Sequence, residues 1–342
     1  MSRMIEPTAS KSNAPTFFNA SEYLAERRFW ADACSPSRRI IIEDSIRQEL
    51  EPTSGNRPFG VSIPDGSTEI WLALTPPSRT GQSVLIHAAR VDPAKQRLLT
   101  LASDNASEAI SANLEQICNQ SSITFLQWAT DPDDEPLGPA LLGMQHLSTL
   151  DYLALEIDDG SENSPPLMTP LQCEPLLHHD ATAVAQFESI VAGTYVQTLD
   201  CPELETMQTP AEILAGYRQS DAYAPKWWMT VREATEPRDA ISIDGLDQSN
   251  GDTCSVVGCF ILACHGDPTS PVIELVYMGV LPEHRGRQFG AAMLESIIQL
   301  ARQHHASRLI LAVDRRNQPA SRIYLDRGMT TLFGECVWGR RL

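Results

Sequence analysis

The chain has 342 residues, which exceeds the usual size of a single hydrophobic core, so two domains of ordinary size are expected. Its net charge of -18 argues against general nucleic-acid binding, which requires a cationic surface. No segment approaches the roughly 20 apolar residues that span a bilayer, and the first residues lack the apolar core of a signal peptide. We therefore expect a cytoplasmic protein that binds neither nucleic acid nor membrane.

Composition divides the chain into two halves. Residues 1–15 have the composition of a disordered tail, and DDGSENSPP at residues 158–166 combines turn formers, charge and proline as interdomain linkers do. We expect one domain over residues 16–160, a linker over 161–168 and a second domain over 169–342.

The elements of the second half alternate between helices and strands. Helical patterns cover residues 181–197 and 209–219, and three strand-like runs follow at 226–234, 254–266 and 271–281. Leu294, Ile297, Ile298 and Ala301 then repeat at helical spacing. A strand at 307–313, a short helix from about 319 to 327 and a strand at 330–338 complete an α/β (α+β) domain.

The first half repeats the second at a nearly constant offset. Residues 70–93 and 259–282 share an apolar strand, a turn, a second apolar strand and a closing proline, and the prolines Pro93 and Pro282 lie 189 positions apart. Gly143 and Gly328 open two similar segments and lie 185 positions apart. The offsets predict a duplicated fold, with chance similarity of amphipathic segments as the alternative.

Chemistry is expected in the second half. The first half has no glycine between Gly81 and Gly138, so its loop AKQRLLTL cannot bring the backbone close to a phosphate. Residues 271–342 carry 10 basic residues, all arginine, against 6 acidic ones. This basic region suits a small bound polyanion, although a solvated arginine-rich face is the alternative. The eight cysteines lack metal-ligand spacing, so no metal site is predicted.

The stretch VYMGVLPEHRGRQFGAAML at residues 276–294 has the pattern of a strand, a basic loop and a helix start. Backbone amides from about residue 287 to 292 would face an anion at the helix N-terminus, and Arg285 and Arg287 would add positive charge. Gln288 occupies a position where such loops usually have glycine. Because the first turn of a helix does not require a positive φ, the sequence predicts a binding loop that is retained but weakened by the Gln288 side chain.

This loop resembles the acyl-CoA loop of the GCN5-related N-acetyltransferase (GNAT) superfamily, Gln/Arg-x-x-Gly-x-Gly/Ala. Arg285 and Gly290 match its first and last positions, and Gln288 departs from it. A second family motif, Asn-x-x-Ala-x-x-x-Tyr-x-x-x-Gly-Phe, is met by five residues with a conservative change at its end: Asn317, Ala320, Tyr324, Gly328 and Met329. Two motifs in the right order make coincidence a poor explanation.

The resemblance implies a fold and a co-substrate. The expected fold is two tandem GNAT-like domains, each a mixed, mostly antiparallel central sheet flanked by helices, with a degenerate N-terminal copy and a catalytic C-terminal one. Acetyl-CoA would be the co-substrate, and no metal would be needed. The implied CoA-binding residues are Met278, Val280, Arg285, Gly286, Arg287, Gln288, Phe289, Gly290, Ala291, Asn317 and Ala320.

The resemblance also implies catalytic residues. Tyr324 would protonate the departing thiolate, with a core tyrosine bonded to a carbonyl as the alternative. Glu274 lies eleven residues before Arg285, the spacing of the base glutamate in the histone-acetylating members. A solvent-facing acid at a strand edge is the alternative. Gly279 would mark a strand bulge, beside which an amide near Met278 or Val280 would stabilise the oxyanion.

These expectations describe an N-acetyltransferase. It would transfer an acetyl group to an amine of a small molecule or peptide by direct attack in a ternary complex, and its two-domain layout resembles that of mycothiol synthase. The competing hypothesis is an inactive CoA-binding regulatory or scaffold protein, which Gln288 keeps open. The sequence specifies neither the acceptor nor the oligomeric state.

Overall fold

The structure is a computed structural model, and it describes most of the chain. Described are residues 16–18, 59–65, 68–74, 83–91, 111–119 apart from 113 and 117, 123–133, 142–157, 171–218, 223–234, 255–266 and 269–342. The predicted tail and the predicted linker lie outside these residues. The chain forms two compact units, a first unit of residues 1–147 with 335–342 and a second unit of residues 148–334.

The first unit contains a mixed sheet. Its first four strands run antiparallel to one another, the fifth is parallel to the fourth, and the end of the last strand of the chain is antiparallel to the fifth. In order across the sheet these are β1 (Thr16–Phe18), β2 (Phe59–Asp65), β3 (Thr68–Leu74), β4 (Ser83–Val91), β5 (Phe125–Thr130) and β12 (Thr330–Arg341).

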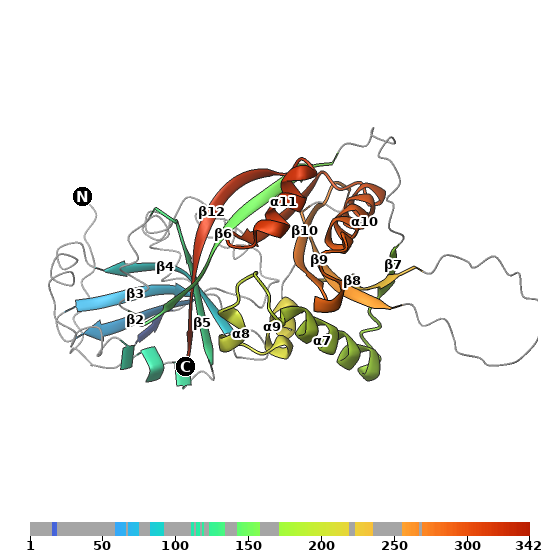
Figure 1. Ribbon diagram of the computed structural model, residues 1–342. Coiled ribbons are helices and arrows are strands. Elements are labelled where there is room, and N and C mark those ends of the chain that lie inside the picture. The colour runs from blue at the N-terminus through green and yellow to red at the C-terminus, as the bar shows by residue number, and fades with distance from the viewer. Residues whose placement is uncertain are drawn as a thin grey trace, which may run out of the picture. The chain divides into compact units, whose positions relative to one another are not determined.

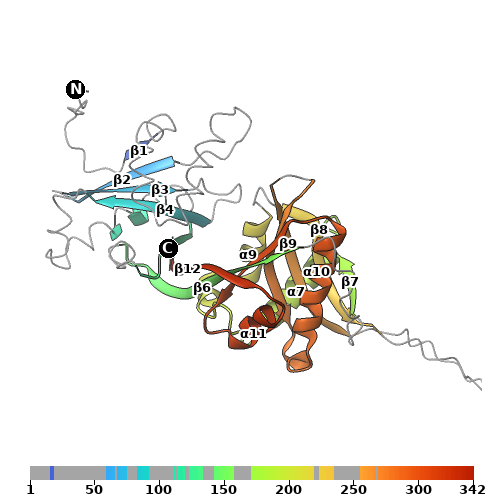
Figure 2. The same ribbon diagram turned by 90° about the horizontal axis from the view of Figure 1, so that it is seen from above.

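The second unit repeats this pattern. Four antiparallel strands are followed by a parallel neighbour and then by an antiparallel strand from the other half of the sequence. In order these are β7 (Leu171–Pro175), β8 (Tyr223–Glu233), β9 (Val256–His265), β10 (Val272–Val280), β11 (Arg308–Asp314) and β6 (Gln145–Glu156). Figure 2 shows β7 at the edge of this sheet, beside β8.

The shared pattern confirms the predicted fold class of mixed, mostly antiparallel sheets. The strands β4 and β10 are each nine residues long and start 189 positions apart, and β6 and β12 are each twelve residues long. Gly143 and Gly328, which precede β6 and β12, both adopt positive φ, 63° and 84°. That the first half is a degenerate copy stays a prediction.

The compact units do not follow the predicted order of domains along the chain. Leu150–Glu156 of β6 pairs with β11, and Cys336–Arg341 of β12 pairs with β5. Each half of the sequence therefore supplies one strand to the unit formed mainly by the other half. The domain boundaries at 160 and 169, which were based on the predicted linker, stay a prediction. Local composition gives no signal for the exchange of strands between the two units.

Helices cover both faces of the second unit's sheet (Figure 1). On one face lie α7 (Ala181–Tyr195) and α9 (Pro210–Tyr217), joined through the short α8 (Leu204–Met207). On the other lie α10 (Phe289–Gln303) and α11 (Gln318–Asp326). Within the part of the chain that the structure describes, no helix is long and apolar enough to cross a membrane.

Two hydrophobic cores lie between these helices and the sheet, one on each face. The adjacent residues Trp227 and Trp228 point to opposite faces because side chains alternate along a strand, and they are 4% and 1% exposed. Trp227 belongs to the cluster under α10, and Trp228 belongs to the cluster under α7 and α9. Both tryptophans are therefore core residues.

Candidate active site

A gap between two parallel strands forms the centre of the candidate site. The strands β10 and β11 are paired from Val272 with Arg308 to Leu275 with Leu311. Beyond this point β10 continues along β9 to Val280, while β11 continues along β6 to Asp314. The two strands thus diverge, and among the described residues no strand pairs with the edge of β10 that faces β11 after Leu275.

The bulge in β10 lies earlier than the sequence suggested. The register against β9 shifts between Leu275 and Tyr277, whereas Gly279 pairs regularly with Cys259. A Cβ atom on Gly279 would lie 2.5 Å from the side chain of Thr194 on α7. Glycine is therefore needed here for the close approach of α7 to the strand, and the expectation of a bulge at Gly279 was wrong.

The loop before α10 presents its backbone amides without acceptors. Gly286 and Gln288 have φ values of 76° and 63°, and Gln288 is the N-cap residue of α10 without a side-chain cap. Among the described residues, nothing accepts a hydrogen bond from the six consecutive amides of residues 286–291. Such a run of free donors at a helix N-terminus, with alternating backbone conformation, is a ready anion site.

The conformation of Gln288 corrects the expectation that this position tolerates glutamine without strain. A left-handed backbone costs an L-residue roughly 1–2 kcal/mol because Cβ crowds the following carbonyl. We expect Gln288→Gly to raise the free energy of unfolding by about 1 kcal/mol, after the greater backbone entropy of glycine is subtracted, and to tighten acetyl-CoA binding. Chemical denaturation and titration calorimetry measure the two effects.

Gln299→Gly is the matched control for this substitution. Gln299 is exposed in the middle of α10, where glycine costs about 1 kcal/mol relative to a good helix former. The two Gln→Gly substitutions should therefore change stability in opposite directions. Destabilisation by Gln288→Gly, or unchanged or weaker affinity for acetyl-CoA, would contradict the strain explanation.

Arg285 holds the loop in place. Its guanidinium donates to the carbonyl oxygens of Val280 (3.0 Å), Val196 (2.8 Å), Gln197 (3.2 Å) and Thr194 (2.9 Å). These contacts tie the end of β10 to the C-terminal end of α7. Arg285 was expected to attract a phosphate, but four of its N–H groups are already used, so it acts here as a positioning residue.

Arg287 is also engaged within the protein. It donates to both carboxylate oxygens of Glu233 at 3.0 and 3.3 Å, and its Nη1 lies 3.1 Å from Nδ1 of His284. Its guanidinium stacks over the ring of Phe289 at 4.8 Å. The positive charge expected from Arg287 is thus paired with Glu233, which leaves the backbone amides as the principal donors of the loop.

The next three positions of the loop motif serve packing in different ways. Phe289 is 2% exposed and belongs to the core under α10. A Cβ on Gly290 would lie 3.3 Å from Cδ1 of Ile323, so this glycine lets α11 approach α10. Ala291 is half-buried.

Met278 and Val280 pack against the same core from the diverging end of β10.

Asn317 and Ala320 start the helix that carries Tyr324. The side-chain oxygen of Asn317 accepts a hydrogen bond from the amide of Ala320 at 3.3 Å, so Asn317 is the N-cap of α11. Ala320 is half-buried against the core. The predicted spacing of Asn317, Ala320 and Tyr324 along one helix is confirmed, and the first two fix where α11 begins.

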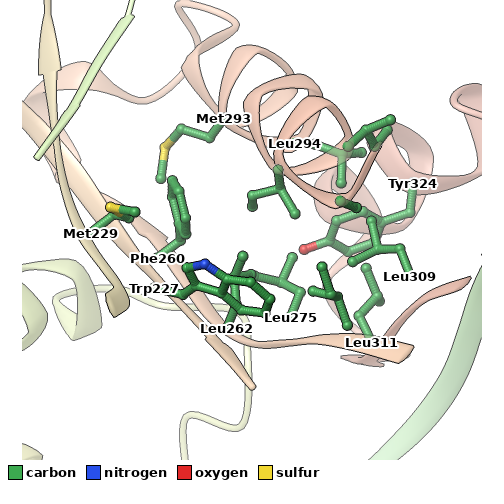
Figure 3. Close-up of a cluster of buried hydrophobic side chains, with 14 of the residues drawn as sticks. Trp227, Met229, Phe260, Leu262, Leu275, Met293, Leu294, Leu309, Leu311 and Tyr324 are labelled. Carbon is green, nitrogen blue, oxygen red and sulfur yellow. The ribbon is translucent and has the colours of Figure 1, made fainter. Parts of the chain in front are cut away.

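The Tyr324 side chain is buried in the core under α10. It is 6% exposed, and Figure 3 shows its ring among Leu275, Leu309 and Leu311, at the point where β10 and β11 separate. Burial raises its pKa, and the nearby charge of Asp200 raises it further. No described residue is hydrogen bonded to the hydroxyl, so the alternative of a core tyrosine bonded to a carbonyl is not observed.

Glu274 lies on the face of the sheet opposite to Tyr324. Ile273 and Leu275 belong to the core under α10, so alternation directs Glu274 toward α7 and α9. Its Oε2 atom lies 2.6 Å from Nε2 of His265 on the neighbouring strand β9. The side chain is 33% exposed, which is intermediate between a buried base and a solvent-facing acid.

A polar network lies at the end of β11, and the sequence did not predict it. Asp314 is fully buried, and Arg316 donates to it while also pairing with Glu203 at 2.6 Å. The amide of Cys201 donates to Asp314 at 3.1 Å, and the amide of Asp314 donates to Asp200 at 3.1 Å. No motif marks these residues, because their partners lie more than 110 positions apart in the sequence.

The comparisons with known proteins agree with this geometry. Residues 204–329 match the model of the acetyltransferase (GNAT) family. Among solved structures, a GCN5-related N-acetyltransferase from Sphaerobacter thermophilus is 16% identical and has a TM-score of 0.52, with 96% of this chain and 95% of that chain covered. This likeness shows that the fold is shared. No curated protein sequence matches the chain.

Two further structures are similar to the chain. The glucosamine N-acetyltransferase region of a fungal multi-domain GH3 beta-N-acetylglucosaminidase is 12% identical with a TM-score of 0.51, and the match covers 97% of this chain and 38% of that chain. A tandem GNAT protein from the clavulanic acid biosynthesis pathway is 13% identical with a TM-score of 0.47, and 96% and 98% of the two chains are covered. The resemblance to mycothiol synthase stays a prediction. The part of the chain that matches the acetyltransferase (GNAT) family model, residues 204–329, contains the diverging strands, the amide loop and Tyr324.

Proposed function

We propose that the second unit is an acyl-CoA-dependent N-acetyltransferase that transfers an acetyl group from acetyl-CoA to a primary amine by direct attack in a ternary complex. The observation that carries this proposal is the run of six amides at residues 286–291 that have no hydrogen-bond acceptor among the described residues. The family match over residues 204–329 supports it. Acetyl-CoA supplies the thioester, and the protein supplies the binding and proton-transfer groups.

The amide loop fits a pyrophosphate. Free N–H groups at the start of α10 would donate to its oxygens, and the positive end of the helix dipole would stabilise its charge. Met278 and Val280 would border the extended arm of the co-substrate, because the edge of β10 toward β11 lacks a partner strand at this point. A CoA-binding role for Asn317 and Ala320 follows from their position at the start of α11.

Proton transfer would involve groups on both faces of the sheet. The amine attacks the thioester carbonyl, the carbon–sulfur bond breaks, and the departing thiolate takes a proton from the Tyr324 hydroxyl. The amine loses its proton, for which Glu274 is the candidate base; its hydrogen bond with His265 provides an onward route for the proton. Backbone amides near Met278 or Val280 would stabilise the oxyanion.

Calorimetry with acetyl-CoA, followed by thiol release with a panel of primary amines, tests this function. We expect saturable binding of acetyl-CoA and amine-dependent release of CoA. Binding without turnover of any amine would favour the competing hypothesis of a CoA-binding regulatory protein. Absence of binding would contradict both functions, and Glu274→Gln with normal turnover would remove Glu274 from the mechanism.

A further inference from the structure

We propose that His284 is a positioning residue for the amide loop (residues 286–291) and that it holds the loop in its binding shape only while its imidazole is neutral. Acid should therefore weaken the binding of acetyl-CoA. The inference rests on the proposed function, since it concerns how that site keeps its affinity for the co-substrate. Neither family motif includes His284, and the proposed proton transfers do not use it.

The His284 side chain is buried beneath the start of the loop. It is 8% exposed and ends the short 3-10 helix η1 (Pro282–His284), which follows β10. Its ring meets the ring of Phe289, the first residue of α10, edge to face, with the centroids 5.8 Å apart. A buried imidazole costs free energy unless its nitrogens have hydrogen-bond partners, so the partners of both nitrogens matter.

Both nitrogens of the His284 ring have partners, and these define its protonation state. The Nδ1 atom lies 3.1 Å from Nη1 of Arg287, and the Nε2 atom lies 3.2 Å from Oγ of Ser255. A guanidinium has only donors, so Nδ1 must accept this hydrogen bond with its lone pair. The ring proton therefore lies on Nε2 and is donated to Ser255, which makes His284 a neutral imidazole of one tautomer.

Arg287 transmits this arrangement to the loop. Its guanidinium also donates to both carboxylate oxygens of Glu233, at 3.0 and 3.3 Å, and the amide of Glu233 donates to the carbonyl of Ser255 at 3.0 Å. In the chain, Arg287 lies between Gly286 and Gln288, which both have positive φ. A fixed Arg287 side chain thus restrains the left-handed turn that directs the loop amides.

Protonation of His284 would remove this restraint. The second proton would bind Nδ1, so the hydrogen bond from Arg287 would be lost and two cations would face each other. The Glu233 carboxylate attracts both cations, but Arg287 already uses both of its oxygens. Glu283 and Arg285, the chain neighbours of His284, are exposed, and the Arg285 guanidinium donates to carbonyl oxygens at the end of α7.

The direction of the effect distinguishes this inference from simple charge attraction. A positive charge added beside an anion site would by itself tighten the binding of a pyrophosphate. Loss of the His284–Arg287 hydrogen bond should weaken it, because the donors of the loop are backbone amides whose direction depends on the turn. Only molecules with the competent loop contribute to the apparent affinity. We therefore expect acid to weaken binding.

The test compares the wild type with His284→Asn. The side-chain oxygen of asparagine can accept the hydrogen bond from Arg287, but asparagine does not titrate. Acetyl-CoA binding is measured by calorimetry at pH 8 and pH 5.5. We expect the ratio of the wild-type Kd to the variant Kd to rise about 10-fold between the two pH values. The phosphates of acetyl-CoA also titrate, but they affect both proteins equally and cancel in the ratio.

His179→Asn is the matched control. His179 is exposed just before α7, so replacing it removes a titrating histidine without changing the contacts of the loop. The ratio of the wild-type Kd to the Kd of this control should stay constant between pH 8 and pH 5.5. A rise equal to that found with His284→Asn would mean that general surface charge causes the pH dependence, and it would contradict the inference.

His284→Phe separates the hydrogen bond from ring packing. Phenylalanine keeps a ring against Phe289 but offers no acceptor to Arg287. We expect the affinity for acetyl-CoA to fall about 10-fold at both pH values, KM for acetyl-CoA to rise more than kcat falls, and asparagine to restore most of the loss at pH 5.5. Equal affinities of the Asn and Phe variants, with both shown to be folded by their Tm, would contradict a role for the Nδ1 acceptor.

Nuclear magnetic resonance of the free protein tests the same arrangement without acetyl-CoA. At pH 8 the ring nitrogen signals of His284 should show the tautomer with its proton on Nε2. As the pH falls, the backbone amide signals of residues 286–291 should shift in step with the ring in the wild type. In His284→Asn these amide signals should lack that transition. This readout decides the inference even if His284→Phe fails to fold.

Three outcomes would overturn the inference: a ring proton on Nδ1 at pH 8, loop amide signals that do not follow the ring, or a ratio of Kd values that stays constant or falls with acid. Failure of the proposed function has a different signature. A protein that binds acetyl-CoA with the expected pH dependence but transfers no acetyl group would contradict the enzyme and leave the role of His284 standing. If no acetyl-CoA binds at either pH, the proposed function fails and the resonance data alone decide the role of His284.

Discussion

Tyr324→Phe is expected to lower kcat for acetyl transfer by about 100-fold to 10,000-fold, the range in which a positioned general acid contributes. The affinity for acetyl-CoA should remain, since the loop at residues 286–291 is unaffected. No described residue is hydrogen bonded to this hydroxyl, so removing it should leave the free energy of unfolding unchanged or raise it by up to about 1 kcal/mol. Steady-state kinetics, calorimetry and chemical denaturation measure the three quantities.

Tyr223→Phe is the matched control. Tyr223 lies on β8 in the same unit, and its hydroxyl lies 3.2 Å from Nδ1 of His178. This substitution should lower stability by about 1 kcal/mol and leave kcat within twofold of the wild type. Normal kcat in Tyr324→Phe would remove this tyrosine from the reaction, whereas a large loss of stability would mean that its hydroxyl has a structural partner.

The second large effect is expected at Arg316. Arg316→Ala should lower the free energy of unfolding by about 3 kcal/mol, because it leaves the fully buried carboxylate of Asp314 without its cation. It also releases Glu203, so the segment that carries Asp200 loses one of its anchors to β11. Urea denaturation at pH 7 measures the loss.

The neighbouring substitution Arg315→Ala provides the control. Arg315 pairs with Asp151 at 2.8 Å, but both side chains are partly exposed, and such pairs contribute less than about 1 kcal/mol. Two adjacent Arg→Ala changes should thus differ by about 2 kcal/mol or more. Equal effects would show that burial of Asp314 does not decide the outcome.

The contribution of Asp314 should depend on pH in a defined direction. Burial alone would raise its pKa, but hydrogen bonds from the Arg316 side chain and from backbone amides together hold the pKa below the ordinary value. Asp314 therefore stabilises the folded protein above the unfolded-state pKa of about 3.9, and this contribution is lost as the pH falls through the folded-state pKa. The stability difference between wild type and Arg316→Ala should shrink accordingly below about pH 4.

The sequence alone was sufficient for the elements and motifs that depend on local patterns. Helical spacing at residues 294–301 predicted α10, and the motif that includes Asn317, Ala320 and Tyr324 placed them on one short helix. The nearly constant offsets between Pro93 and Pro282 and between Gly143 and Gly328 predicted a duplicated fold, and the strand order of the second unit repeats that of the first. These features follow from the periods of helices and strands and from glycine's access to positive φ, all of which are short-range properties.

Features that join distant parts of the chain depended on the tertiary structure. The exchange of β6 and β12 pairs residues separated by more than 150 positions, and no local signal encodes such a pairing. The structure also gave Arg285 and Arg287 internal partners, because the carbonyls at the end of α7 and the carboxylate of Glu233 come within reach only after folding.

The left-handed backbone of Gln288 was likewise decided by the turn that joins β10 to α10, against the preference of the residue itself. The same is true of the polar network at the end of β11, in which Asp200, Cys201 and Glu203 meet Asp314 and Arg316 from more than 110 positions away. The sequence by itself thus determined the family motifs and the local elements, since these depend on residues that are close together in the chain. Charge pairing and backbone strain were decided by long-range packing, which brings together groups that are far apart in the sequence.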